Sequence, residues 1–132
     1  MNLFTRRNIA ILAVLSIACM LAIIPRRTAQ AMPPGTNIEG FVLKWVDLQL
    51  QGVKLATVEA YHPFLGLVCT TTTGSNGDWR CDDVPPADYY TVFAEKITAE
   101  DICGGSFSFG PVRRHKTTTI PAIIMQCSPP FP

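Results

Sequence analysis

The segment LVCTTTTGSNGDWRCDD, residues 67–83, carries the clearest folding signal of this 132-residue chain. Runs rich in β-branched and aromatic residues flank the turn sequence Gly74-Ser-Asn-Gly77, and such side chains suit a pleated, half-buried strand. Asn76 and Gly77 both tolerate the positive φ that a tight hairpin turn requires. The segment therefore predicts two short strands joined by a turn.

The same alternation of short strand and turn extends in both directions along the chain. Clusters of Gly, Pro or Asn separate runs rich in Val, Ile, Thr, Tyr and Phe, and no stretch after residue 31 sustains helical periodicity. This spacing is typical of an all-β sandwich or barrel, and Pro121 predicts an edge position or a bulge in the last strand. We expect seven strands, over residues 38–45, 55–61, 67–73, 79–83, 89–95, 107–109 and 117–125.

Residues 1–31 have the pattern of an export signal peptide. Arg6 and Arg7 precede the apolar run Ile9–Ile24, and Ala29-Gln-Ala31 is a small-residue cleavage site. A retained N-terminal anchor is the alternative, because the apolar run is slightly longer than a usual signal core. We therefore expect a domain of residues 32–132 in a secreted location, whether periplasmic, extracellular or on the cell surface.

The charge of this domain bears on its partners. Four of the 11 Lys and Arg residues precede residue 32, so 7 remain against all 10 Asp and Glu, and 7 − 10 gives a net charge of −3. A negative domain is poorly suited to a phosphate backbone, which argues against nucleic acid. We expect a protein or glycan partner, no cofactor, and contact with a membrane only through an uncleaved N-terminal segment.

Four of the five cysteines lie in the expected domain, at Cys69, Cys81, Cys103 and Cys127. An even number in a small exported domain favours two disulfides, and no pair has the short spacing of zinc ligands. Sequence alone allows three connectivities. The predicted hairpin sets Cys69 nearly opposite Cys81, so we favour Cys69–Cys81, which leaves Cys103–Cys127.

Four motifs, in this order, resemble the carboxypeptidase regulatory-like domains: Ile38-Glu-Gly-Phe-Val42, Leu50-Gln-Gly-Val53, Thr71-Thr-Thr-Gly-Ser-Asn-Gly-Asp-Trp79 and Val84-Pro-Pro-Ala-Asp-Tyr-Tyr-Thr-Val92. The resemblance covers about residues 38–125. It implies a seven-stranded Greek-key β-sandwich of the prealbumin-like (transthyretin-like) type. It also implies that Trp79 and Cys81 point inward, and that Tyr90, Val92 and Ala94 share an inward face.

On the first expected strand the resemblance leaves three large apolar side chains, Phe41, Leu43 and Trp45, on the outer face. They form a candidate contact surface, to which we add the aromatic Tyr61. One interpretation is a surface for a protein or glycan partner. We favour the other, in which the chain itself covers the stripe, with either its Pro-rich tail or residues 95–116.

The sequence predicts no catalytic residues and no metal ligands. Only His62 and His115 could serve as a general base, and both fall in expected loops. The C-terminal Tyr-Arg-Gly-Ser of the hydroxyisourate hydrolases, the catalytic relatives on this fold, is missing. We therefore expect a noncatalytic binding or structural module rather than an enzyme. A carbohydrate-binding module is the alternative, and a small secreted hydrolase is a third and weaker one.

Overall fold

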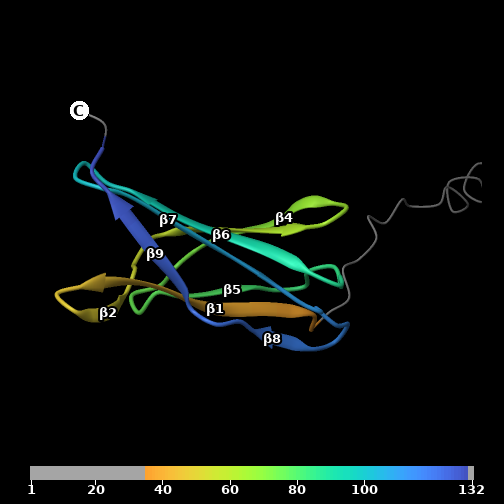
Figure 1. Ribbon diagram of the computed structural model, residues 1–132. Coiled ribbons are helices and arrows are strands. Elements are labelled where there is room, and N and C mark those ends of the chain that lie inside the picture. Colours follow the sequence, from red (N-terminus) through yellow and green to blue (C-terminus); the bar gives the residue numbers. More distant parts are fainter. Residues whose placement is uncertain (1–34, 131–132) are drawn as a thin grey trace, which may run out of the picture. The chain divides into compact units, whose positions relative to one another are not determined.

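The computed structural model describes residues 35–130, and this part of the chain contains nine β-strands and no helix (Figure 1). The expected all-β class is confirmed. The signal peptide predicted for residues 1–31 lies outside the described residues. Within residues 35–130, no helix is long and apolar enough to cross a membrane. The strands are β1 (Asn37–Val46), β2 (Gln49–Gly52), β3 (Thr57–His62), β4 (Gly66–Thr72), β5 (Asp78–Cys81), β6 (Tyr90–Ile97), β7 (Ile102–Phe109), β8 (Thr117–Thr119) and β9 (Ile123–Ser128).

Nine strands replace the seven expected, for two local reasons. β2 was not expected, because its turn is Asp47-Leu48, with φ of 48° and 67°, instead of a sequence rich in Gly or Asn. A leucine in this left-handed region is uncommon, so the sequence carries no hairpin signal there. The expected last strand is divided into β8 and β9 around Pro121, which cannot donate a ladder hydrogen bond.

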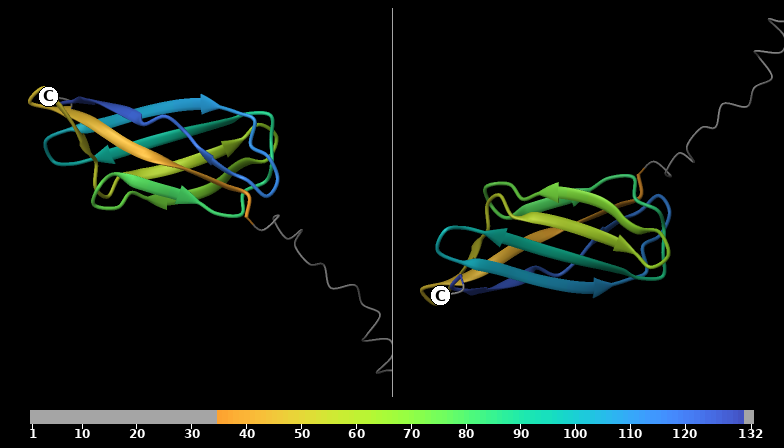
Figure 2. Two further views of the ribbon diagram at one scale, coloured as in Figure 1. Left: turned by 90° about the horizontal axis from the view of Figure 1, so that it is seen from below. Right: turned by 90° about the horizontal axis from the view of Figure 1, so that it is seen from above.

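Strand β1 is the branch point of the sheet. Its first half pairs with β5 in antiparallel and with β8 in parallel fashion, and its second half pairs with β2 and β9. From β9 the sheet continues through β7, β6 and β3 to β4. The sheet curls, so that β7, β6, β3 and β4 form one face and β5, β1 and β8 the other, as the opposite views of Figure 2 show.

Alternating side chains from both faces fill the space between them. Tyr90, Val92 and Ala94 of β6 are all buried, as expected, and so are Trp79 and Cys81 of β5. The Tyr90 hydroxyl donates to the backbone carbonyl of Pro85, and burial raises the pKa of Tyr90 to about 12. The inward positions that the resemblance implies for these five residues are therefore confirmed.

Both predicted disulfides are present. Cys103 and Cys127 face each other directly on β7 and β9. Cys69–Cys81 joins β4 to β5, but the reason given for it was wrong, because these strands do not pair. β4 pairs with β3, and β5 pairs with β1. The turn at Asn76-Gly77 therefore carries the chain between the two faces, and the disulfide links their edges.

Candidate functional site

The four residues of the predicted contact surface do not form one site. Phe41 and Trp45 are 46% and 62% exposed on the outer side of β1, and Leu43 between them is half-buried. Cover by the chain itself, which we favoured, is therefore wrong for Phe41 and Trp45. Neither residues 95–116 nor the tail as far as Pro130 encloses them, because β9 pairs alongside β1 and β7 belongs to the opposite face of the curled sheet. Tyr61 lies apart, on β3.

Strand β2 adds a residue that the sequence did not reveal. Leu50 stands directly opposite Trp45 in the β1–β2 ladder and is 44% exposed. On the other side of β1, Ile124 of β9 is level with Leu43 and is also exposed. Residues in register on neighbouring strands point to the same side of a sheet. We call these four residues, Leu43, Trp45, Leu50 and Ile124, the Trp45 surface.

Tyr61 contributes to a different feature, on the outer side of β3 and β6. Its ring meets the ring of Phe93 edge to face, with centroids 5.5 Å apart. Its hydroxyl donates to Glu59 Oε2 over 2.7 Å, and this bond raises the pKa of Tyr61. A shallow groove beside the pair is lined by Thr57, Glu59, Phe93 and Glu95. We call this feature the Tyr61 groove.

The imidazole of His62 holds two loops in place. Nε2 lies 3.2 Å from the Pro86 carbonyl, and Nδ1 accepts hydrogen bonds from the backbone N–H of Phe64 and of Leu65, at 3.1 and 3.2 Å. These contacts require the neutral ring with its proton on Nε2, because a carbonyl cannot donate. Both nitrogens are thus occupied by backbone groups, so His62 is arranged as a structural residue.

The remaining candidates for chemistry are dispersed. The backbone N–H of His115 donates to the Thr36 hydroxyl at the start of the described chain. Arg80 forms ion pairs with Asp82 and Glu39, at 2.5 and 3.0 Å. In the part of the chain that the structure describes, no three His, Cys, Asp or Glu side chains are grouped so that they could hold a metal ion.

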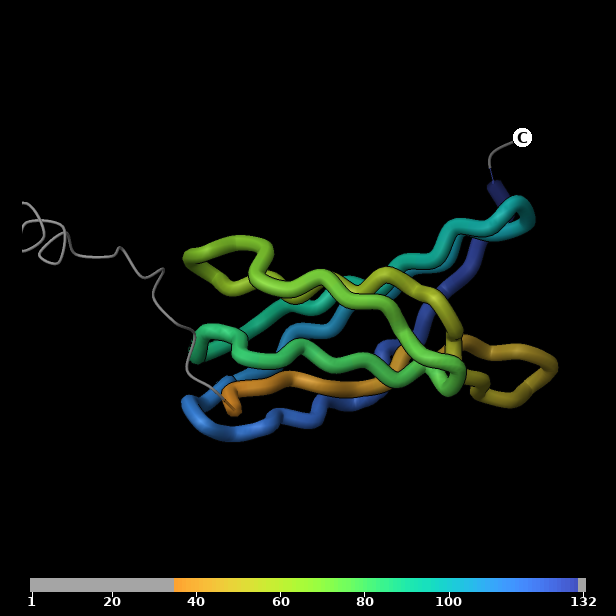
Figure 3. The backbone as a smooth tube through the Cα atoms, turned by 180° about the vertical axis from the view of Figure 1, so that it is seen from behind, coloured from red at the N-terminus to blue at the C-terminus, as the bar shows by residue number. Residues whose placement is uncertain are grey.

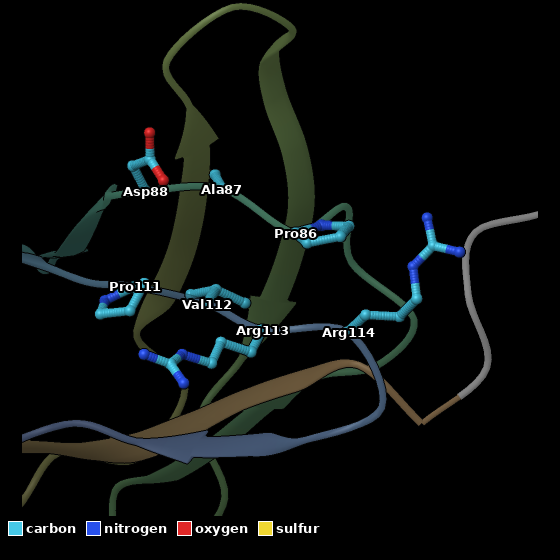
Figure 4. A pocket seen from close by; sticks show the side chains of 7 residues that line it. All are labelled: Pro86, Ala87, Asp88, Pro111, Val112, Arg113 and Arg114. Carbon is cyan, nitrogen blue, oxygen red and sulfur yellow. The ribbon is translucent and has the colours of Figure 1, made fainter.

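A third surface feature is an open pocket between the loop that precedes β6 and the loop that follows β7 (Figure 4). Ala87 and Val112 bridge these loops through reciprocal backbone hydrogen bonds of 3.1 and 2.8 Å. Arg113 and Arg114 extend from the rim in different directions, and the Asp88 carboxylate points away from both guanidinium groups (Figure 4). Arg113 and Arg114 are far from Asp88 in the sequence, and the fold brings all three to one pocket.

No protein-family model and no curated protein matches the chain. The resemblance to carboxypeptidase regulatory-like domains therefore depends on its four motifs.

Proposed function

We propose that this chain is an exported, noncatalytic binding module that engages a protein partner through the Trp45 surface. Its architecture would be that of a carboxypeptidase regulatory-like, prealbumin-like sandwich, with β2 and the division of the last strand as its own additions. Two disulfides in so small a domain are typical of proteins that fold in an oxidising compartment, which supports export.

One observation carries the proposal: Trp45 and Leu50 form an exposed cross-strand pair on the outer edge of the sheet. Tryptophan is prominent among residues that dominate the energy of protein interfaces, since it buries a large area with few rotatable bonds. Beyond β2 no further strand pairs within residues 35–130, so an added strand could pair at this edge of the sheet. An apolar surface beside a free strand edge suits a protein better than a soluble small molecule.

The arrangement of His62 supports a noncatalytic role, because both of its ring nitrogens bind backbone groups. The pair Arg80–Asp82 is exposed and needs no catalytic explanation. Binding would therefore be the whole of the activity.

Photo-crosslinking in the exporting cell tests this proposal. A photoreactive amino acid at Leu48, the exposed tip beside the Trp45 surface, is expected to give a discrete crosslinked protein band. Leu50→Ser should abolish that band and change the free energy of unfolding by less than about 1 kcal/mol, since Leu50 is 44% exposed. The matched control carries the photoreactive residue at Phe93 on the other face. Crosslinking at Leu48 that persists in Leu50→Ser, or no band at all, would contradict the proposal.

A glycan ligand is the second candidate, and the Tyr61 groove favours it. Phe93 offers an exposed ring on which a sugar could stack, and Glu59 and Glu95 offer acceptors for its hydroxyl groups. Trp45 and Tyr61, both in the predicted contact surface, lie on β1 and β3, which β9, β7 and β6 separate in the sheet order, so they do not form one glycan site. A glycan array on the oxidised protein, with Phe93→Ala and Trp45→Ala in parallel, decides the matter: binding lost only in Phe93→Ala supports this candidate.

A further inference from the structure

Three loops and the start of the described chain meet at one end of the domain. His62 at the β3–β4 turn contacts the Pro86 carbonyl, Ala87 bridges Val112, and the Lys116 carbonyl accepts from the Asn37 N–H. Figures 1 and 3 show this end opposite to the β1–β2 turn. We call it the loop end, formed by residues 62–66, 84–89 and 110–116.

The loop end presents apolar side chains at its tips. Phe64 and Leu65 are 91% and 62% exposed on the β3–β4 turn, and Tyr89 is 55% exposed on the next loop. The turn is held by the two bonds from its backbone to His62 Nδ1. Exposed apolar residues on an ordered tip have a hydration cost, which suggests that something covers them in use.

The same end carries unpaired positive charge. Arg113, Arg114 and Lys116 are exposed and form no ion pair within residues 35–130. Of the carboxylates at this end, Asp82 is paired with Arg80, whereas Asp83 accepts only from the neutral backbone N–H of Gly35, at 2.9 Å, and keeps its charge. Two carboxylates, Asp83 and Asp88, therefore stand against the three cations Arg113, Arg114 and Lys116, which leaves an excess of one positive charge.

We propose that the loop end docks on an anionic lipid surface, with Phe64 and Leu65 entering the interfacial region and the arginines binding lipid phosphates. Apolar tips beside basic groups are the combination by which peripheral domains bind such surfaces. Exposed apolar tips have no use on a soluble polyanion, which is why a bilayer is the better occupant. The net charge of the domain is −3, so the domain as a whole is not attracted to an anionic membrane. Docking therefore depends on the loop end alone, and this end should face the membrane. The inference does not rest on the protein partner proposed above.

The test uses the oxidised, exported protein with a tryptophan introduced at Phe64→Trp and, as matched control, at Leu48→Trp. Leu48 is 94% exposed at the tip of the β1–β2 turn, at the opposite end. The wild-type signal of Trp45 and Trp79 is subtracted. With vesicles of phosphatidylcholine and phosphatidylglycerol, we expect a blue shift and quenching by brominated lipid for Phe64→Trp only. Because the readout is local, it holds whether or not residues 1–31 are retained.

Arg113→Gln with Arg114→Gln, in the Phe64→Trp protein, tests the charge. Each basic residue near an anionic surface contributes about 1 kcal/mol, so the partition coefficient should fall about fivefold per arginine. Both side chains are exposed, so the melting temperature should not change. The proposal is overturned if the spectrum of the Phe64→Trp protein is the same with and without vesicles. It is equally overturned if Leu48→Trp responds as strongly, or if a sulfated polysaccharide binds at the arginines while the introduced tryptophan stays in water.

Discussion

The Cys69–Cys81 disulfide joins β4 and β5, two strands that do not pair with each other, and this makes its removal informative. β4 and β5 are neighbours at the two edges of the curled sheet, but each pairs only with another strand. In Cys69→Ala/Cys81→Ala, the 12-residue separation predicts a loss of about 3 kcal/mol from loop entropy. Cys81 is fully buried, so its replacement adds a small cavity cost. For a domain of this size, a loss of about 3 kcal/mol lowers the melting temperature by about 12–24 °C.

Cys103→Ala/Cys127→Ala is the matched control. Its separation of 24 residues predicts a slightly larger entropic loss, about 3.5 kcal/mol, from the same relation. These cysteines, however, lie in the antiparallel β7–β9 ladder, where Ile102 and Gly104 of β7 also pair with residues of β9. Amide hydrogen exchange should therefore lose protection in β4 and β5 for the first variant, and keep it in β7 and β9 for the control. If the melting temperature of Cys69→Ala/Cys81→Ala falls but amide exchange in β4 and β5 does not change, the disulfide is not what holds these two strands together.

Three further predictions concern single residues. Between pH 10 and about 12, Tyr90 ionises in the unfolded chain but not in the folded chain, so the free energy of unfolding should fall as pH rises, by about 2–3 kcal/mol in total. Urea unfolding at pH 9 and at pH 11.5 measures this fall. A phenolate absorbance of the folded protein that titrates entirely near pH 10 would contradict it. Gly77→Ala should lower the free energy of unfolding by about 3 kcal/mol or more, because φ is +81° and the new Cβ would lie 2.3 Å from the Val42 carbonyl oxygen. Gly66→Ala, where φ is +76° and the surrounding space is open, should lower it by only about 1–2 kcal/mol. Thermal melts of the two variants compare these losses. Leu43→Ser should lower the free energy of unfolding by about 1 kcal/mol, since Leu43 is half-buried. Trp45→Ser should lower it by less than about 0.5 kcal/mol, since Trp45 is mostly exposed. Equal losses in the two variants would show that the Trp45 surface is covered.

What the sequence could predict was local. Alternation along one strand places Tyr90 and Val92 on the same face, and the family resemblance implied that this face points inward, as their burial confirms. The Cys69–Cys81 pairing was predicted from a hairpin that does not exist; it was right because the turn at Asn76-Gly77 still returns the chain to the same region. A nearby return of the chain is enough to bring two cysteines together, whichever strands they pair with.

What the sequence could not predict depends on register between distant segments. Leu50 belongs to the Trp45 surface only because an unusual Asp47-Leu48 turn folds β2 back on β1. Phe93 meets Tyr61 because β6 pairs with β3, across a separation that no local pattern encodes. In each case the sequence shows that an apolar residue is present, but only the pairing of the strands determines which residue lies next to it.

The positions of the candidate surfaces bear on how they could work together. The Trp45 surface adjoins the β1–β2 turn, and the loop end lies at the other end of the strands (Figure 1). Both expose large apolar side chains, but the loop end adds to them three cations that have no ion pair within residues 35–130. Sites that share no residue contribute independently to binding energy, so a domain resting on lipid through Phe64 would keep its affinity for a partner at Trp45. Docking at the loop end would instead restrict the directions from which that partner can approach, because β1 and β2 would then point away from the surface.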